Sequence, residues 1–559
     1  MVVAMELDAQ EPFSLCLEQI HGDALERELL ALGSIGGEVL PSGFFSVTRP
    51  ALSELDFLAR EHLKIKMQEA GMTVEDHPLG LIGTYEGTES DLPSVLALSH
   101  FDSVPKGGMY DGCVGVIGAI ESVKALHTMG IRPRRNIQVM ALTGEESYRF
   151  NFALFGSRGI FHGLTERELE AKRPDDISLG DAIEAAGFTR QSVLAPRFTS
   201  EDIAAAVELH VIQDERLNDG QNAIAVVEAI AAPHRFEIAI SPDNPVEPVS
   251  APGDVYQINI AGKAGHSGAT PMGSEYRADG LLAAGDMLRF CTLLNAYLKK
   301  QGVNSSVHIG GVTVDGQAMN KIPGQTAMQI KICGDAEARS VAHDLILSFI
   351  EKKNADLSGI ERKFDQSPIS MVSGQDTDGT FYDAAHMDAL FQTSAKIIRK
   401  VNLSAVRYRE HDVVGTVGTY NVQNGCIKLG VDMRGIDLES RENAVSEVIS
   451  FVQSITTNQH SVKITELAGS GEPTVMNPDL VAIAEHSIVS NNIGPYMKTY
   501  SPAGHDMQNV VRAGIPGVML FMPSRNDGAA HVPEEYSTPE DLEAGTKALA
   551  AMLYTLSAN

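Results

Sequence analysis

Short apolar runs recur in the first part of the chain and once more near its end. They occupy residues 94–98, 137–142, 204–209 and 517–521. Residues 53–70 and 114–127, by contrast, repeat apolar side chains at helical spacing, and Gly71 follows the first of these stretches as a helix-terminating residue. Alternation of short buried runs with helices is typical of a mostly parallel α/β sheet covered on both faces.

The middle of the chain has a different pattern. Apolar and polar positions alternate, as in half-exposed strands, at 256–260, 306–313 and 327–332, while 280–299 and 337–352 have helical spacing. This β-α-β-β-α order predicts a small α+β domain. Most of the order then recurs, with helical patterns at 381–401 and 441–455 and strand patterns at 406–417 and 426–433.

The two middle sets keep an offset of 101 residues. Asn320 and Asn421, Gly324 and Gly425, and Gly334 and Gly435 are the matching pairs. We interpret residues 254–356 and 357–457 as two diverged copies of one small lid domain, inserted into a catalytic domain formed by 1–253 and 458–559. The alternative is chance recurrence of common elements. Matches at a fixed offset, most of them turn glycines, favour duplication.

Composition excludes some classes of function. The chain of 559 residues has 44 Lys and Arg against 73 Asp and Glu, a formal net charge of −29, which argues against nucleic acid or an anionic membrane as a partner. Its five scattered cysteines form no CxxC pair, and neither a basic, apolar leader nor a bilayer-length apolar run is present. We therefore expect several domains and a cytoplasmic location.

Metal-type side chains follow the apolar runs. The first run leads into His100 and Asp102, the second into Glu145 and Glu146, and the third into His210. A glycine-rich loop supplies Asp111, and a short loop after the last run leads to His531. Because sites in parallel sheets form beyond the carboxyl ends of the strands, these groups are expected to meet in one crevice.

Each of these residues has a simpler explanation when taken alone. A histidine at the end of a strand is more often only hydrogen-bonded, and an acidic pair more often lies in a solvated loop. Three histidines and several carboxylates at separate strand ends are harder to explain in that way. Imidazole and carboxylate together suit Zn²⁺, Mn²⁺, Co²⁺ or Ni²⁺ rather than a metal that prefers thiolates.

An ordered set of motifs resembles the M20 family of two-metal amidohydrolases and peptidases, specifically its N-carbamoyl-L-amino acid hydrolase and allantoate amidohydrolase branch. The resemblance covers almost the whole chain except roughly one copy of the repeat. It rests on Ser99-His100-Phe101-Asp102-Ser103-Val104, Gly107-Gly108-Met109-Tyr110-Asp111-Gly112, Glu145-Glu146-Ser147-Tyr148-Arg149-Phe150, Glu208-Leu209-His210-Val211-Ile212-Gln213, Gly265-His266-Ser267-Gly268-Ala269-Thr270-Pro271-Met272 and Ala503-Gly504-His505-Asp506.

The resemblance implies a role for each matching residue. Asp111 would bridge two divalent ions, zinc or manganese with cobalt or nickel also compatible. Glu146 and His531 would complete one site, and His100 and His210 the other. Asp102 would orient His100, and Glu145 would be the general base. Three further residues would contact substrate: His266 as oxyanion donor, with Gln213 and Asn320 as polar contacts, although the latter two types often only satisfy backbone groups.

Some positions depart from the family pattern. The family has an arginine that binds a substrate carboxylate. In the first copy Cys333 occupies that position, but Asp432-Met433-Arg434 restores the pattern in the second. A surface arginine at a strand end is the competing interpretation of Arg434. The glycine after Gln213 is replaced by Asp214, and Ser367 stands where the offset predicts a match to His266. These departures concern the substrate rather than the metal ligands.

The function expected from the resemblance is hydrolysis of a linear amide C–N bond, most consistent with an N-carbamoyl or related N-acyl amino acid. The alternatives are a dipeptidase or aminoacylase with the same metals, and a catalytically dead binding protein, which is expected to lack Glu145 or a ligand. The expected partner is a small amide substrate that carries a carboxylate. Because small domains pair in M20 dimers, a chain with two copies is expected to work as a monomer, and the alternative is a homodimer with an additional domain.

Overall fold

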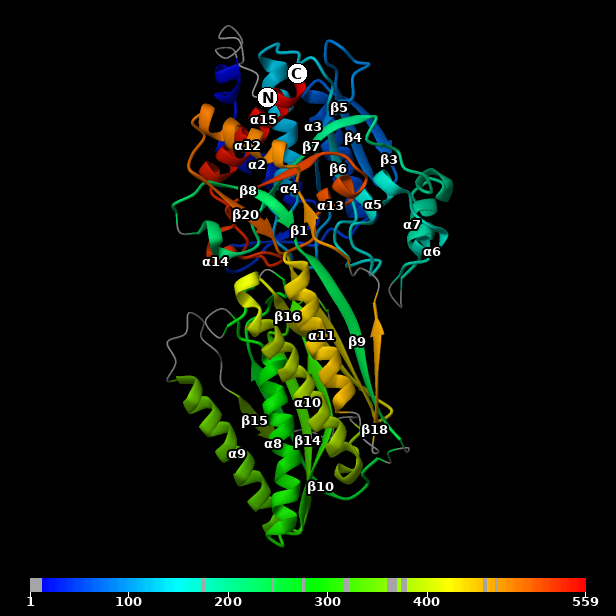
Figure 1. The fold of residues 1–559 in the computed structure, drawn as a ribbon, viewed down its shortest axis with the longest axis vertical. Helices are drawn as coiled ribbons and strands as arrows, with labels where there is room; N and C mark the ends of the chain where they lie inside the picture. The colour runs from blue at the N-terminus through cyan, green and yellow to red at the C-terminus, as the bar shows by residue number, and fades with distance from the viewer. Residues whose placement is uncertain are drawn as a thin grey trace. The chain divides into compact units, whose positions relative to one another are not determined.

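The computed structural model describes residues 13–172, 176–218, 220–243, 246, 248–268, 270–273, 277–315, 319, 321–358, 369–373, 380–455, 460–467 and 471–559. The chain forms two compact units (Figure 1). Unit 1 comprises Met1–Ile230 and Thr474–Asn559, and unit 2 comprises Ala231–Pro473. In the described ranges no helix is both long and apolar enough to cross a membrane.

Unit 1 is built on one mixed sheet with the strand order β19-β8-β21-β7-β5-β6-β4-β3, and β20 pairs with β8. Its central strands β6, β5, β7 and β21 are mutually parallel, and β3, β4, β8 and β19 join antiparallel. The strands are β3 (Thr73–His77), β4 (Gly80–Tyr85), β5 (Ser94–His100), β6 (Ile137–Leu142), β7 (Ile203–Val211), β8 (Ile224–Ile230), β19 (Thr474–Val475), β20 (Tyr496–Ser501) and β21 (Gly517–Met522).

The four parallel strands are the four apolar runs of the sequence. Every residue of β5 and β21 is buried, which explains why these runs show no polar alternation. Helices α4 (Cys113–Thr128) and α15 (Pro539–Ser557) pack together and over β5 and β7, and α3 (Glu54–Glu69) packs on β3 and β4. The Ser53 hydroxyl caps α3 by accepting a hydrogen bond from the Asp56 N–H.

The other elements of unit 1 are shorter or peripheral. They are α2 (Gly22–Gly33), β1 (Gly37–Val39), β2 (Phe45–Val47), α5 (Phe155–His162), α6 (Glu166–Leu169), α7 (Leu179–Ala185), η1 (Arg190–Val193), η2 (Glu215–Leu217), α12 (Pro478–Ser490), α13 (Met507–Arg512) and α14 (Arg525–Gly528).

Unit 2 contains two antiparallel sheets with the orders β12-β14-β10-β15 and β16-β17-β9-β18. The first set comprises β10 (Gly253–Ala261), β11 (Gly265–His266), α8 (Gly280–Lys300), β12 (Ser305–Val314), β13 (Lys321–Ile322), β14 (Gln325–Gly334), α9 (Ala336–Ser358) and β15 (Ser370–Ser373). The second comprises β9 (Ala232–Pro242), α10 (Ala384–Arg407), η3 (Arg409–His411), β16 (Val414–Gln423), β17 (Cys426–Gly435), α11 (Leu438–Ser454) and β18 (His460–Glu466).

The registers of the two sheets match strand by strand. In β12 the register shifts between Ile309 and Gly311, and in β16 it shifts between Val417 and Thr419. The skipped residue is a glycine in both strands, Gly310 and Gly418, and each bulge lies opposite equivalent points of β14 and β17. We name the two sets copy 1 and copy 2, and we propose that they arose by duplication.

The copies are nested rather than consecutive. Copy 2 takes its first strand, β9, from residues that precede copy 1, and its last strand, β18, lies beyond residue 457. The boundaries at 253/254, 356/357 and 457/458 therefore differ from those of the structure, where the units change at Ile230/Ala231 and Pro473/Thr474. The physical reason is strand pairing, because β9 hydrogen-bonds with β17 and β18.

Two details of the expected repeat also change. The predicted strand at 406–417 begins instead at Val414, since α10 continues to Arg407. The offset between β12 and β16 is 108 rather than 101, so Asn421 in β16 aligns with Thr313 in β12, and Asn320 lies outside the described residues. The two glycine pairs do occupy equivalent positions. Gly324 and Gly425 directly precede β14 and β17, and Gly334 and Gly435 are the last residues of these strands.

Candidate metal centre

The predicted ligands of unit 1 lie at one edge of its sheet. His100 is the last residue of β5, and His210 is the penultimate residue of β7. Glu146 follows the end of β6, and His531 follows β21. These four strands are parallel neighbours, so their carboxyl ends bring together side chains that are far apart in sequence.

Asp111 stands at the centre of the group. Its Oδ1 lies 3.1 Å from His210 Nε2 and 4.0 Å from His100 Nε2. Its Oδ2 lies 3.0 Å from His531 Nε2, which in turn is 3.2 Å from Glu146 Oε1. One carboxylate thus serves two sets of donor atoms, His100–Asp111–His210 and Asp111–Glu146–His531.

The imidazole orientations test whether these residues suit a cation. His210 Nδ1 is 3.0 Å from the Val211 carbonyl and His100 Nδ1 is 3.1 Å from the Asp102 carbonyl, so each Nδ1–H is the natural donor. That tautomer leaves a lone pair on both Nε2 atoms, which are 3.5 Å apart. Two lone pairs facing one another beside a carboxylate cannot hydrogen-bond, whereas a shared cation satisfies both.

The glycine after Asp111 is required by this packing. Gly112 has a φ of +67°, and a Cβ there would lie 2.4 Å from His100 Nε2. A side chain at this position would displace the histidine ring, so the Asp-Gly pair of the loop has a steric cause.

The electrostatics of the group are those of a partly buried anionic site. Burial raises the pKa of Glu146 to about 7, with the charge of Asp111 adding to the effect. Burial also lowers the pKa of His210 to about 4. For His531 burial acts downward, but Glu146 and Asp111 outweigh it and raise the pKa to about 10. Carboxylates gathered in this way favour a bound cation.

Glu145 adjoins the ligand set. Burial raises the pKa of its carboxyl well above the ordinary value, and the charges of Glu146 and Asp506 act in the same direction. A carboxylate whose pKa is raised accepts a proton more readily, which is the property that a general base requires when it must also return that proton.

Asp102 has a wider structural role than orienting His100. Its Oδ1 accepts hydrogen bonds from the N–H groups of Gly144 at 2.8 Å and Glu145 at 3.2 Å, and its Oδ2 accepts one from Glu146 at 3.2 Å. His100 Nδ1 is farther from the carboxylate, at 3.6 Å, than from the main-chain oxygen of Asp102. The Asp102 carboxylate therefore anchors the loop after β6.

Two buried carboxylates at the centre were missed by the sequence reasoning. Glu535 Oε1 accepts hydrogen bonds from the N–H groups of Tyr110 at 2.8 Å and Asp111 at 2.7 Å. Burial raises the pKa of Glu535 to about 8. Glu208, in β7, accepts from the Met507 N–H at 3.0 Å and forms a buried group with His210 and His505. The acidic pair Glu534-Glu535 shortly after His531 was the available signal.

The predicted substrate residues are placed differently. Gln213 Nε2 lies 3.4 Å from each Asp111 carboxylate oxygen, so Gln213 belongs to the centre in unit 1. His266 and Arg434 belong to unit 2: His266 is in β11, paired with Lys321, and Asn320 lies outside the described residues. The first-copy position Cys333 and Arg434 occupy equivalent points of β14 and β17.

Arg434 is buried and forms an ion pair within its own strand. Its Nε lies 2.8 Å from Asp432 Oδ1 and its Nη2 lies 3.2 Å from Asp432 Oδ2. The Arg235 guanidinium also binds Asp432, at 2.8 Å. Although burial acts upward, these two arginines hold the pKa of Asp432 well below its usual range. Arg434 is thus 3% exposed rather than a surface side chain.

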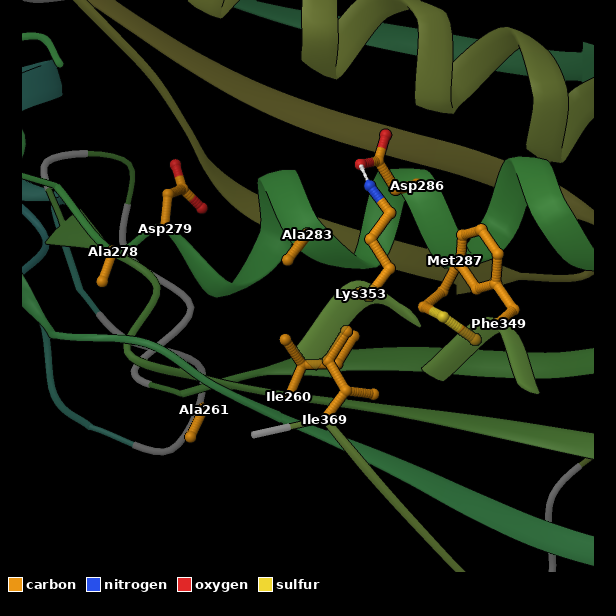
Figure 2. A pocket seen from close by; sticks show the side chains of 10 residues that line it. All are labelled: Ile260, Ala261, Ala278, Asp279, Ala283, Asp286, Met287, Phe349, Lys353 and Ile369. Carbon is orange, nitrogen blue, oxygen red and sulfur yellow. Dashed lines mark hydrogen bonds and ion pairs between the residues drawn. The ribbon is translucent and has the colours of Figure 1, made fainter. Parts of the chain in front are cut away.

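A cavity of about 100 Å³ lies in copy 1, lined by residues of α8, α9 and β10 (Figure 2). Its lining includes Met287, Phe349 and Ile260, and the Lys353 ammonium is 2.5 Å from an oxygen of Asp286 beside it. None of the lining residues comes from the loops that carry the predicted metal ligands.

Comparisons with known proteins identify the family of the chain. The model of Peptidase family M20/M25/M40 matches residues 96–555. Ureidoglycolate hydrolase of Oryza sativa is 25% identical over 553 residues, covering 96% of this chain and 85% of that protein. Allantoate amidohydrolase of Escherichia coli is 26% identical over 544 residues, covering 96% and 98%. N-carbamoyl-L-amino acid amidohydrolase of Geobacillus stearothermophilus is 33% identical over 271 residues, covering 48% and 60%.

Solved structures share the fold. An amidase of the hydantoinase/carbamoylase family from Burkholderia multivorans matches with a TM-score of 0.58 at 21% identity, covering 97% of this chain and 98% of that one. The structure of AtUAH in complex with glyoxylate matches with a TM-score of 0.56 at 22% identity, covering 97% and 100%. The chain belongs to peptidase family M20/M25/M40 and is a hydrolytic enzyme of its amidohydrolase group.

Proposed function

We propose that the enzyme hydrolyses a linear amide C–N bond in an N-carbamoyl or related N-acyl amino acid. The observation that carries this proposal is the Asp111 carboxylate, whose two oxygens face two separate sets of His and Glu donors with Glu145 alongside. The relatives are named for ureidoglycolate, allantoate and N-carbamoyl amino acids, compounds that combine a ureido group with a carboxylate.

The residues of the proposed centre divide the chemistry between them. His100, Asp111, Glu146, His210 and His531 would hold two divalent ions, zinc or manganese, with cobalt or nickel also compatible with the donors. Such ions supply Lewis-acid chemistry, acidifying water and polarising the amide carbonyl. Glu145 takes a proton from the attacking water and delivers it to the leaving nitrogen. His266 donates to the oxygen that gains charge.

Three further residues would bind the substrate. Arg434 is the proposed carboxylate anchor, and its pair with Asp432 would keep the guanidinium in one orientation. Gln213 and Asn320 are the proposed polar contacts. We also propose that copy 2 takes the place of a partner subunit and that the protein works as a monomer.

The test is a substrate screen on metal-reconstituted enzyme. Purified apoenzyme is loaded in turn with Zn²⁺, Mn²⁺, Co²⁺ and Ni²⁺, and each form is assayed with ureidoglycolate, allantoate, N-carbamoyl amino acids, N-acyl amino acids and dipeptides. Turnover confined to the ureido and N-acyl compounds is expected. Preference for dipeptides would reassign the substrate class, and inactivity of every metal form on all of these amides would overturn the proposal.

A further inference from the structure

Arg277 is a buried arginine that touches both copies of unit 2. It lies three residues before α8 and is 7% exposed. Its guanidinium donates to the main-chain oxygens of Ser267, Thr270 and Pro271 in copy 1. Burial lowers the pKa of Arg277 to about 10. A buried guanidinium has to have its donors satisfied, so these contacts define where it can lie.

The remaining contacts of Arg277 cross to copy 2. Its Nη1 lies 2.7 Å from the Thr416 hydroxyl and 3.1 Å from the Gly415 carbonyl, both in the edge strand β16. Among the described residues, each hydrogen bond of Arg277 ends on a carbonyl or hydroxyl oxygen, and none ends on a carboxylate. The side chain therefore joins a loop of one copy to a strand of the other without an ion pair.

The loop held in this way is the one that leaves His266. His266 ends β11, and Ser267, Thr270 and Pro271 follow it directly. The other side of β11 is paired with β13, where His266 lies opposite Lys321. The backbone around His266 is thus fixed by β13 within copy 1 and by Arg277 against copy 2.

The reciprocal contact between the copies uses different chemistry. By the register of the two sheets, His308 in β12 is the counterpart of Thr416, and its Nδ1 accepts a hydrogen bond from the Ala384 N–H at the start of α10. Phe381, three residues before α10, packs against Gly310. An apolar ring, Phe381, thus occupies the place in copy 2 that corresponds to Arg277. The hydrogen bonds that an arginine makes between the copies therefore belong to the loop that carries His266.

We propose that Arg277 is a positioning residue that holds the His266 loop against β16 of copy 2, so that the second copy completes the catalytic arrangement without reacting itself. The inference rests on the proposed function, in which His266 stabilises the oxyanion. It gives the duplication a direct use: the edge strand of copy 2 takes part in placing a residue of copy 1.

The experiment compares Arg277→Ala and Thr416→Val with Thr313→Val as the matched control. Thr313 is an exposed threonine on the corresponding edge strand of copy 1, and its hydroxyl donates to the Ala327 carbonyl rather than accepting from Arg277. Each metal-reconstituted variant is assayed for kcat, KM and metal content. Hydrogen–deuterium exchange of the backbone at 265–273 is then measured, and the kcat of Arg277→Ala is measured again with added guanidinium.

If Arg277 positions the His266 loop, kcat of Arg277→Ala should fall by about 10²-fold, the scale expected when a reacting group is misplaced by about 1 Å. KM and metal content should stay close to wild type. Guanidinium restores part of the kcat, Thr416→Val has a smaller effect in the same direction, and Thr313→Val has none. Exchange at 265–273 rises in the first two variants only.

The result that would overturn the inference is an unchanged kcat in folded Arg277→Ala, or a loss of kcat in the folded variant that guanidinium does not reverse and that no rise in exchange at 265–273 accompanies. Should Arg277→Ala fail to fold, Thr416→Val tests the proposal by itself. Wild-type kcat and wild-type exchange in that variant would reject the positioning role of Arg277. If the wild-type enzyme is inactive on every amide, the proposed function is wrong. The exchange measurement still shows separately whether Arg277 holds the backbone at 265–273.

Discussion

Glu535 Oε1 lies 2.7 Å from the backbone nitrogen of Asp111, so a buried carboxylate from near the end of the chain holds the loop that presents the proposed bridging ligand. The same oxygen accepts the Tyr110 N–H, and the loop is consequently fixed at two successive peptide groups. Groups behind a ligand set its position, and their removal typically costs ~10–100-fold in metal affinity.

Glu535→Ala is therefore expected to weaken divalent metal binding by about 10–100-fold. Glu535→Gln, which keeps an oxygen acceptor, should lose less. Competition with a chromophoric chelator measures the affinity directly and does not require a substrate. Glu534→Ala is the control, because the neighbouring Glu534 is exposed and its side chain is not part of the centre. Equal affinities for Glu535→Ala and wild type would show that the loop holds Asp111 without this carboxylate.

Glu145→Gln is expected to lower turnover by about 10²–10⁴-fold with both ions retained, because the amide cannot accept a proton. Metal analysis and single-turnover kinetics on the same preparation separate the two effects. If the variant keeps full metal content and more than about a tenth of the wild-type rate, another group must be the general base.

Arg434→Lys is expected to raise KM for a carboxylate-bearing substrate while the enzyme remains folded. The lysine preserves a positive charge beside buried Asp432 but loses the two-pronged geometry of the guanidinium. Initial-rate measurements give KM and kcat, and thermal unfolding of the variant is the control for folding. A folded variant with wild-type KM would leave the substrate carboxylate to another residue.

The molecular mass in solution tests the role of copy 2. Light scattering at several concentrations is expected to give about 60 kDa, the mass of one chain. A mass near 120 kDa, twice 60.0 kDa, that persists on dilution would show that a second chain is still used and that the second copy does not replace it.

Asp388→Asn is expected to stabilise unit 2 at alkaline pH. Asp388, on α10, accepts a hydrogen bond from Asn295 of α8, and burial raises its pKa to about 7. For an acid with a raised folded pKa, the energetic cost of ionisation is absent below the unfolded pKa, near 4, and complete above about 7. The melting temperature of the variant should accordingly exceed that of wild type at pH 8 and match it at pH 4. A larger gain at pH 4 would contradict the sign of the shift.

The sequence by itself determined the local chemistry of this protein. The apolar runs at 94–98, 137–142, 204–209 and 517–521 became the four parallel strands because continuous apolar segments must be buried on both faces. Parallel pairing then brings their carboxyl ends together, which is why His100 and His210 could be expected to meet from strand ends alone, whereas Asp111 and His531, which lie in loops, were assigned by the family resemblance.

Only the tertiary structure decided what pairs over long distances. The helical and alternating patterns around residue 400 indicated a second α+β set, but nothing local shows that its first strand is β9, which pairs with β17 nearly 200 residues later. Likewise, Arg434 has the same sequence signature whether exposed or buried, and its pair with Asp432 follows from the burial of β17. Glu535 binds the backbone of Tyr110 and Asp111, and Arg277 binds the Gly415 carbonyl, and backbone atoms carry no residue-specific signal from which such contacts can be predicted.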